Sequence, residues 1–101
     1  MDIAISKNKV PVRLTNERWM HITIGHPEIA DYYYEIFETI EEPEIIYEGS
    51  NNELIAAKGI AKNKYLLVIY KESNKKDGFV ITAFLSNKKQ YFKNKKILWQ
   101  Q

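Results

Sequence analysis

The chain has 101 residues and a mass of 11.9 kDa; 45% of its residues are apolar and 28% are charged. This size predicts one domain spanning residues 1–101, and this composition predicts a folded chain. The absence of cysteine excludes a disulfide framework, a zinc ribbon and thiol catalysis. The longest apolar run, Tyr65 to Tyr70, is far shorter than a membrane span, and residues 1–7 lack the pattern of a secretory signal. We therefore expect a cytoplasmic protein that does not bind membranes.

Positive and negative charges are divided between the two halves of the chain. Residues 1–50 carry four basic and ten acidic side chains, a net charge of −6, whereas residues 51–101 carry eleven and three, a net charge of +8. The densest basic segment holds Lys88, Lys89, Lys93, Lys95 and Lys96, with Tyr91 and Phe92 among them. Lysines neutralise phosphates and aromatic rings stack on bases, so this segment predicts a surface that binds RNA. The alternative is a solvated lysine face without a partner.

The N-terminal half has the pattern of a lead-in followed by two helices. Residues 1–14 are expected to be a short extended segment. Thr15 is a suitable N-cap for a helix that runs to about Ile24 and stops at Gly25. Pro27 fits the first position of a second helix, which must end near Pro43. The apolar stripe of this second helix is Ile29, Tyr33, Ile36 and Ile40.

After Pro43 the pattern changes to that of a sheet. Strands are expected at 45–47, 54–60, 65–70 and 79–85, and the third is apolar on both faces, as in a central strand. The polar residues 73–78, which end in Asp77-Gly78, predict a hairpin turn, and residues 97–99 add an edge strand or anchor the terminus. Because the connections are short, neighbouring strands should pair antiparallel. The sequence thus predicts an α+β fold, with N-terminal helices packed on one side of a four-stranded antiparallel sheet.

His21 and His26 are the only histidines in the chain. Their spacing does not match that of zinc ligands, so we expect neither a metal site nor a cofactor. Two imidazoles are instead the smallest set of groups that can act as general acid and general base near neutral pH. The alternative interpretation is that His26 caps a helix and His21 packs on an amphipathic helix, without a chemical role.

Three further side chains suit chemistry at a phosphate. Thr82 places a hydroxyl in a nearly all-apolar strand, where it needs a hydrogen-bond partner or a functional role. Strict alternation puts Thr82 on the face of Val80 and Phe84, opposite Phe79. Lys71 and Arg18 would supply positive charge, although Lys71 could also extend to water without any such role.

Six segments of the chain, taken in order, have a familiar spacing: Leu14 to Ile22, His26 to Glu28, Thr39 to Ile46, Leu67 to Lys71, Asp77 to Phe84 and Lys96 to Trp99. Together they resemble a prophage-associated nuclease family of the barnase–EndoU–colicin–RelE (BECR) superfold, over about residues 12–99. The resemblance implies a helical N-terminal part on a four-stranded antiparallel sheet and metal-independent ribonuclease chemistry. It also places His21, His26 and Thr82 in motif positions, and Lys71 in a position that often carries a basic residue.

The resulting hypothesis is a toxin-like endoribonuclease that uses the ribose 2′-hydroxyl of RNA as nucleophile. His21 and His26 are the acid/base pair, Lys71 and Arg18 stabilise charge, and Thr82 donates to a phosphate oxygen. An antitoxin or immunity protein would then be a partner. One alternative is a non-catalytic module that binds RNA or protein through its basic half. Another is a homodimer in which the acidic helix of one copy meets the basic strands of the other.

Overall fold

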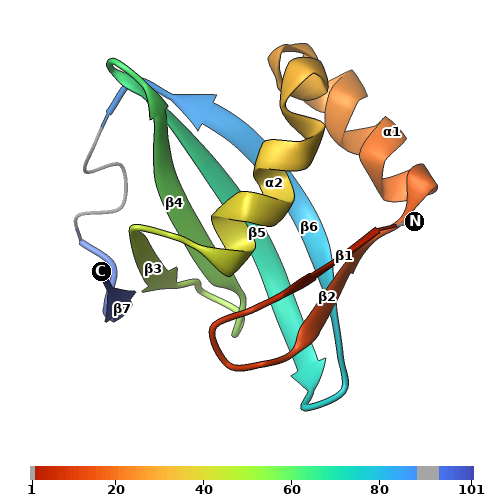
Figure 1. Cartoon of the computed structure of the whole chain (residues 1–101), viewed down its shortest axis with the longest axis vertical. Helices are drawn as coiled ribbons and strands as arrows, with labels where there is room; N and C mark the ends of the chain where they lie inside the picture. Colours follow the sequence, from red (N-terminus) through yellow and green to blue (C-terminus); the bar gives the residue numbers. More distant parts are fainter. Residues whose placement is uncertain (1, 89–93) are drawn as a thin grey trace.

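The protein begins with a strand hairpin, continues with helices and ends with five strands (Figure 1). A computed structural model describes residues 2–88 and 94–101. The elements are β1 (Asp2–Ile5), β2 (Pro11–Leu14), α1 (Asn16–Gly25), the 3-10 helix η1 (Pro27–Tyr32), α2 (Tyr33–Glu41), β3 (Ile45–Glu48), β4 (Leu54–Ala61), β5 (Lys64–Asn74), β6 (Asp77–Ser86) and β7 (Ile97–Gln100). The predicted α+β class is therefore confirmed.

The strands form one mixed sheet of seven strands in the order β1-β2-β6-β5-β4-β3-β7. The antiparallel meander β3-β4-β5-β6 is the predicted four-stranded sheet. The prediction is nevertheless too small. The lead-in folds into the β1–β2 hairpin, β2 pairs in parallel with β6, and β7 extends the other edge along β3. The helices therefore follow a strand hairpin and are not N-terminal. The sequence does not reveal this hairpin, because strands of four residues are too short to show a clear alternation.

Helix α1 begins and ends close to the predicted positions. The Thr15 hydroxyl accepts a hydrogen bond of 3.1 Å from the backbone N–H of Arg18, as expected of an N-cap. Gly25 is still helical, and the helix ends at His26, whose φ of −135° and ψ of 77° leave the helical region. A residue before proline avoids the α conformation, so Pro27 sets this end. The chain then continues as η1 and becomes α-helical again at Tyr33.

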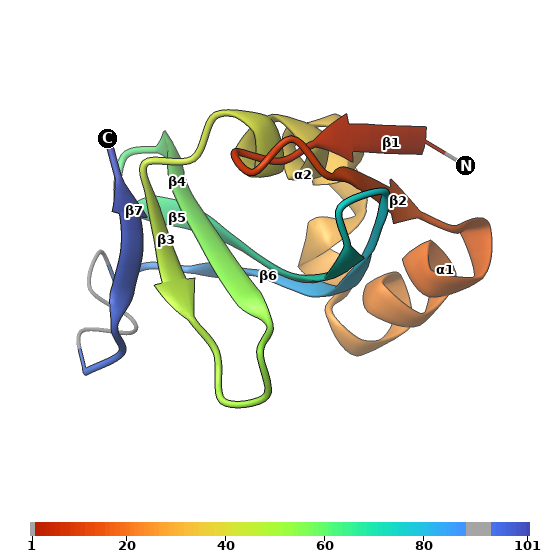
Figure 2. The same cartoon turned by 90° about the horizontal axis from the view of Figure 1, so that it is seen from below.

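The two faces of the sheet are covered differently. On one face α2 packs against β4 and β5, and helix and strand side chains share the main core. Its fully buried members include Val12, Leu14, Ile29, Ile36, Ile40, Leu66, Val68, Tyr70 and Val80. The opposite face of β4, β5 and β6 carries a smaller cluster of Tyr47, Ile55, Ala57 and Leu67, against which Ile69 and Phe84 pack. We call it the distal face; Figure 2 shows the β3–β4 hairpin projecting on this side, away from α2.

Gly78 allows β2 to approach β6. A Cβ atom at Gly78 would lie 2.7 Å from the carbonyl oxygen of Lys71 and 3.3 Å from Val12 Cγ2, so a larger residue would push the strands apart. The predicted hairpin turn over residues 73–78 contains the observed turn, which lies between Asn74 and Asp77, but it is too long, because Asp77 and Gly78 belong to β6. The small residue serves close packing rather than a turn.

The β2–β6 pairing is short, which leaves room for α1 at the sheet edge. It comprises only the pairs Val12–Gly78 and Arg13–Phe79. Beyond them, α1 and η1 contact β6. The α1–η1 junction lies close enough to the distal face of β6 for His26 to contact Phe84 there.

The hairpin loop is fastened to the far end of β5. The Ser6 hydroxyl donates a hydrogen bond of 2.6 Å to Glu72 Oε2, and Asn8 Nδ2 donates one of 3.0 Å to Glu72 Oε1. Ser6 itself is almost fully buried. Hydrogen bonds to a carboxylate are the stronger kind, so Glu72 holds the β1–β2 hairpin against the meander.

Tyr33 links α2 to β1 by a hydrogen bond, and we expect the protein to lose folding stability at alkaline pH, where this tyrosine ionises. Its hydroxyl donates a hydrogen bond of 2.5 Å to Asp2 Oδ2, and burial together with Asp2 raises the pKa of Tyr33 from 10.0 to about 12. Folding therefore favours the neutral phenol, and the stability that this provides below pH 10 is lost as the pH rises from 10 to 12. Between these pH values we expect the free energy of unfolding to fall more steeply for the wild type than for Tyr33→Phe, as measured by urea denaturation.

A Tyr65→Phe variant is the control for this experiment, because Tyr65 makes no side-chain hydrogen bond to a carboxylate among the described residues and is only half-buried. It should keep the slope of the wild type. Equal slopes for Tyr33→Phe and the wild type would contradict the role of Tyr33.

Candidate functional site

The distal face of β5 and β6 carries two polar side chains, Lys71 and Thr82, among apolar ones. Ile69 pairs with Thr82 and Lys71 pairs with Phe79. One extra residue, Ile81, interrupts the alternation of β6 at this point. The predicted division of faces is therefore wrong for Phe79: it lies on the same face as Thr82 and Phe84, whereas Val80 and Ala83 belong to the main core.

The hydroxyl of Thr82 has no bonding partner and reaches solvent. Thr82 is half-buried and makes no side-chain hydrogen bond to any residue in 2–88 or 94–101, yet each buried side-chain nitrogen or oxygen of the described residues has a partner. Its hydroxyl must then lie at the surface of the distal face. Lys71, also half-buried, is a diagonal neighbour of Thr82 across β5 and β6, at a Cα separation of roughly 7–8 Å that a lysine side chain can span.

His26 reaches the same face. Its ring stacks on that of Phe84, with centroids 5.5 Å apart and planes inclined by 29°. Its Nδ1 lies 3.6 Å from Glu28 Oε2, and 41% of the side chain is exposed. Phe84 follows Thr82 by two residues on one strand face, so His26 stacks on the next side chain of that face after Thr82. Three of the five predicted catalytic residues, His26, Thr82 and Lys71, thus gather on the distal face.

Arg18 and His21 occupy a different place. They line a hollow of about 390 Å³ along α1, together with Thr15 and Glu17. Trp19 packs its ring 4.9 Å from that of Tyr33 in α2. At roughly 100° per residue, Arg18 and His21 therefore lie on the flank of α1 that turns away from α2. Within the described residues, no hydrogen bond, ion pair or ring contact joins either of them to His26, Thr82 or Lys71.

The basic segment is described only in part, since Lys89 and Lys93 lie outside the described residues. Lys88 is exposed just beyond the end of β6, and Lys96 is exposed just before β7. Lys95 Nζ donates a hydrogen bond of 3.1 Å to Ser50 Oγ in the β3–β4 loop. Lys88 thus lies near the end of β6 that carries Phe84, whereas Lys95 and Lys96 lie by the β3–β4 loop, at the opposite end of the strands.

Arg13 is a residue of this face that the sequence analysis does not single out. Its guanidinium carbon lies 5.8 Å from the centroid of the Phe79 ring, and its Nη1 forms an ion pair with Asp77. Arg13 reaches Phe79 because β2 pairs with β6. This pairing joins strands that are more than 60 residues apart in the chain, and the local pattern of neither strand predicts it.

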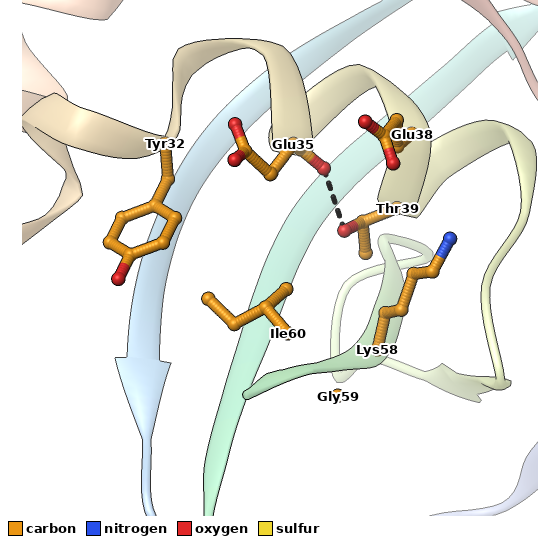
Figure 3. Close-up of a pocket in the computed structure, with 7 residues that line it drawn as sticks. All are labelled: Tyr32, Glu35, Glu38, Thr39, Lys58, Gly59 and Ile60. Carbon is orange, nitrogen blue, oxygen red and sulfur yellow. Dashed lines mark hydrogen bonds between the residues drawn. The ribbon is translucent and has the colours of Figure 1, made fainter. Parts of the chain in front are cut away.

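A second hollow, of about 270 Å³, lies between α2 and β4 on the other side of the sheet (Figure 3). Glu35 and Glu38 line it opposite Lys58, and the Thr39 hydroxyl donates a hydrogen bond of 2.8 Å to the carbonyl oxygen of Glu35. Two carboxylates and one ammonium group disfavour a polyanion. The distal face, with Arg13, Lys71 and His26, is the better candidate for contact with phosphates.

Metal ligands and membrane spans are not found in the described part of the chain. No group of three or more histidine, aspartate or glutamate side chains in residues 2–88 and 94–101 is arranged to hold a metal ion. None of the helices described is both long and apolar enough to cross a membrane.

Comparisons with models of known protein families, with curated proteins and with solved structures find no match. The resemblance to a BECR nuclease family accordingly stays a prediction. Any function assigned to the distal face depends on its own geometry and chemistry.

Proposed function

We propose that this protein is a metal-independent endoribonuclease that cleaves RNA on the distal face of β6. The observation that carries the proposal is the position of His26: its imidazole is stacked on Phe84, beside a solvent-exposed threonine hydroxyl and a lysine. An acid/base group, a neutral donor and a cation are what 2′-hydroxyl attack on a phosphodiester requires.

In the proposed reaction the ribose 2′-hydroxyl is the nucleophile. With Nδ1 of His26 facing Glu28, Nε2 accepts the proton of the 2′-hydroxyl as its oxygen bonds to phosphorus. The bond from phosphorus to the 5′-oxygen breaks, which leaves a 2′,3′-cyclic phosphate on one product. Lys71 offsets the negative charge that develops on the phosphoryl oxygens, and Thr82 donates a hydrogen bond to one of them.

The leaving 5′-oxygen needs a proton, and His21 is the proposed donor, with Arg18 beside it. This role requires the phosphate at Thr82 to lie within reach of His21, directly or through one water, when RNA is bound. A bell-shaped dependence of rate on pH that loses one limb in His21→Ala supports it, and an unchanged profile in that variant contradicts it.

Replacing one ribose at the cleaved position by 2′-deoxyribose tests the mechanism. Because the nucleophile is then missing, we expect cleavage at that position to stop while other positions are still cut, in the presence of a metal chelator. Mass spectrometry of products from the unmodified RNA should show the 2′,3′-cyclic phosphate. Cleavage at the deoxyribose would exclude 2′-hydroxyl attack.

A non-catalytic RNA-binding protein is the second candidate function. It is favoured by the finding that, in the described part of the chain, His26 makes a ring contact with the distal face and His21 makes none. This alternative predicts binding that weakens steeply with salt, no cleavage, and no effect of either histidine.

The proposed partners besides RNA are an antitoxin or immunity protein and a second copy of the chain. A homodimer would join the acidic half of one copy to the basic half of another. Sedimentation at low and high salt tests it, because an electrostatic dimer should dissociate as salt rises.

A further inference from the structure

Two similar side-chain stacks lie on the distal face of β6. In the first, the Arg13 guanidinium lies over the Phe79 ring, with its central carbon 5.8 Å from the ring centroid. In the second, the His26 imidazole stacks on the Phe84 ring at 5.5 Å. In both, a carboxylate lies near the planar nitrogen group: Asp77 pairs with Arg13, and Glu28 Oε2 lies 3.6 Å from His26 Nδ1.

The two stacks are separated along β6 by a segment that includes Thr82. Phe79 and Phe84 are five residues apart, with the bulge at Ile81 between them. At about 3.3 Å per residue, the two rings lie roughly 13–17 Å apart. Thr82 lies in this interval, and Lys71 lies beside the first stack, because it pairs with Phe79 from β5. The distal face therefore presents a planar group with an ammonium group next to it, then a hydroxyl, and then a second planar group.

Both planar groups are accessible from outside. The side chain of Arg13 is 36% exposed and that of His26 is 41% exposed. Guanidinium and imidazole groups stacked on aromatic rings are surfaces on which unpaired nucleobases stack. Bases in a duplex already stack on each other, so they cannot occupy such a surface without leaving the helix.

We propose that the distal face binds single-stranded RNA, with one base stacked on the Arg13–Phe79 pair and another on the His26–Phe84 pair. The phosphates between these bases then lie over Lys71 and Thr82. This inference rests on the proposed function for the identity of the ligand as RNA, and it adds that the strand is unpaired and that its direction follows β6.

Binding is measured separately from cleavage. The probe is a fluorescein-labelled RNA of about ten nucleotides, within the range of single-strand site sizes, with 2′-O-methyl groups throughout, so that no 2′-hydroxyl is present to attack. Fluorescence anisotropy gives its affinity alone and after annealing to its complement. We expect the single strand to bind more tightly than the duplex, and Phe79→Leu to weaken single-strand binding by roughly 5- to 100-fold.

Two variants serve as matched comparisons. Phe79→Trp keeps a flat aromatic surface and should retain the affinity of the wild type. Tyr34→Leu makes the same aromatic-to-aliphatic change at a side chain of α2 that is 75% exposed, and it should also leave the affinity unchanged. Far-UV circular dichroism of each variant confirms that the fold is retained.

The inference is overturned if the duplex binds as tightly as the single strand, or if Phe79→Leu binds no worse than Tyr34→Leu. If the wild-type protein nevertheless cleaves RNA, either result overturns only this inference and not the proposed function. A wild-type protein that neither binds the probe nor cleaves unmodified RNA overturns the proposed function together with this inference.

Discussion

Replacing His26 by alanine is expected to lower the rate of RNA cleavage by roughly 100- to 10,000-fold, the usual range for a lost acid/base group. Its Nε2 is the proposed proton acceptor, and the side chain is placed by its stack on Phe84 and by Glu28. We expect kcat to fall more than KM rises, because the proton is transferred only in the transition state. The measurement is the initial rate of cleavage of a fluorogenic RNA.

Stability should change little in His26→Ala, since the imidazole is 41% exposed and makes no hydrogen bond within the described residues. A Glu28→Gln variant tests how the imidazole is positioned, and it should reduce the rate less than His26→Ala does. A His26→Ala rate within a few-fold of the wild-type rate would remove the catalytic role of this residue and favour the non-catalytic alternative.

The second large effect is expected at Thr82, where valine replaces the hydroxyl with a methyl group of similar size. We expect the rate to fall by roughly 100- to 1,000-fold, as when a donor to a developing oxyanion is removed. Thr82→Ser retains the donor and should retain most of the activity. The same cleavage assay measures both variants.

The stability of Thr82→Val separates a functional role from a structural one. The hydroxyl makes no hydrogen bond to any side chain or backbone group in residues 2–88 and 94–101 and reaches solvent, so its removal should not lower the free energy of unfolding. Full activity in Thr82→Val would contradict the proposed contact with phosphate. A large loss of stability would show that the hydroxyl has a structural partner.

The sequence allowed the helices and the central meander to be predicted because their signals are local. Thr15 as a cap and Pro27 after His26 delimit α1, and the apolar run from Tyr65 to Tyr70 fits the interior of the sheet. The β1–β2 hairpin was missed, because pairing between β2 and β6 depends on strands far apart in the chain. Gly78 was assigned to the turn although it lies in β6, because the sequence does not distinguish a glycine that permits close packing of strands from one that makes a turn.

The candidate site was predictable to a similar extent. Lys71 and Thr82 lie on neighbouring strands, as the meander implied. The side of the sheet on which Phe79 lies was not predictable. The extra residue at Ile81 reverses the alternation of β6, and no feature of the sequence indicates this bulge. The same holds for Arg13, which comes to Phe79 from a strand that was not expected.

The pairing of Arg13 with Phe79 also bears on when during synthesis the site can form. Its two strands lie far apart in the chain. Bringing them together closes a long loop, and local contacts do not offset the loss of chain entropy. A nascent chain can build α1, α2 and the first hairpin of the meander before β6 leaves the ribosome. The surface that includes Arg13 and Phe79 is therefore assembled only after β6 has been made, so a chain interrupted before β6 lacks it.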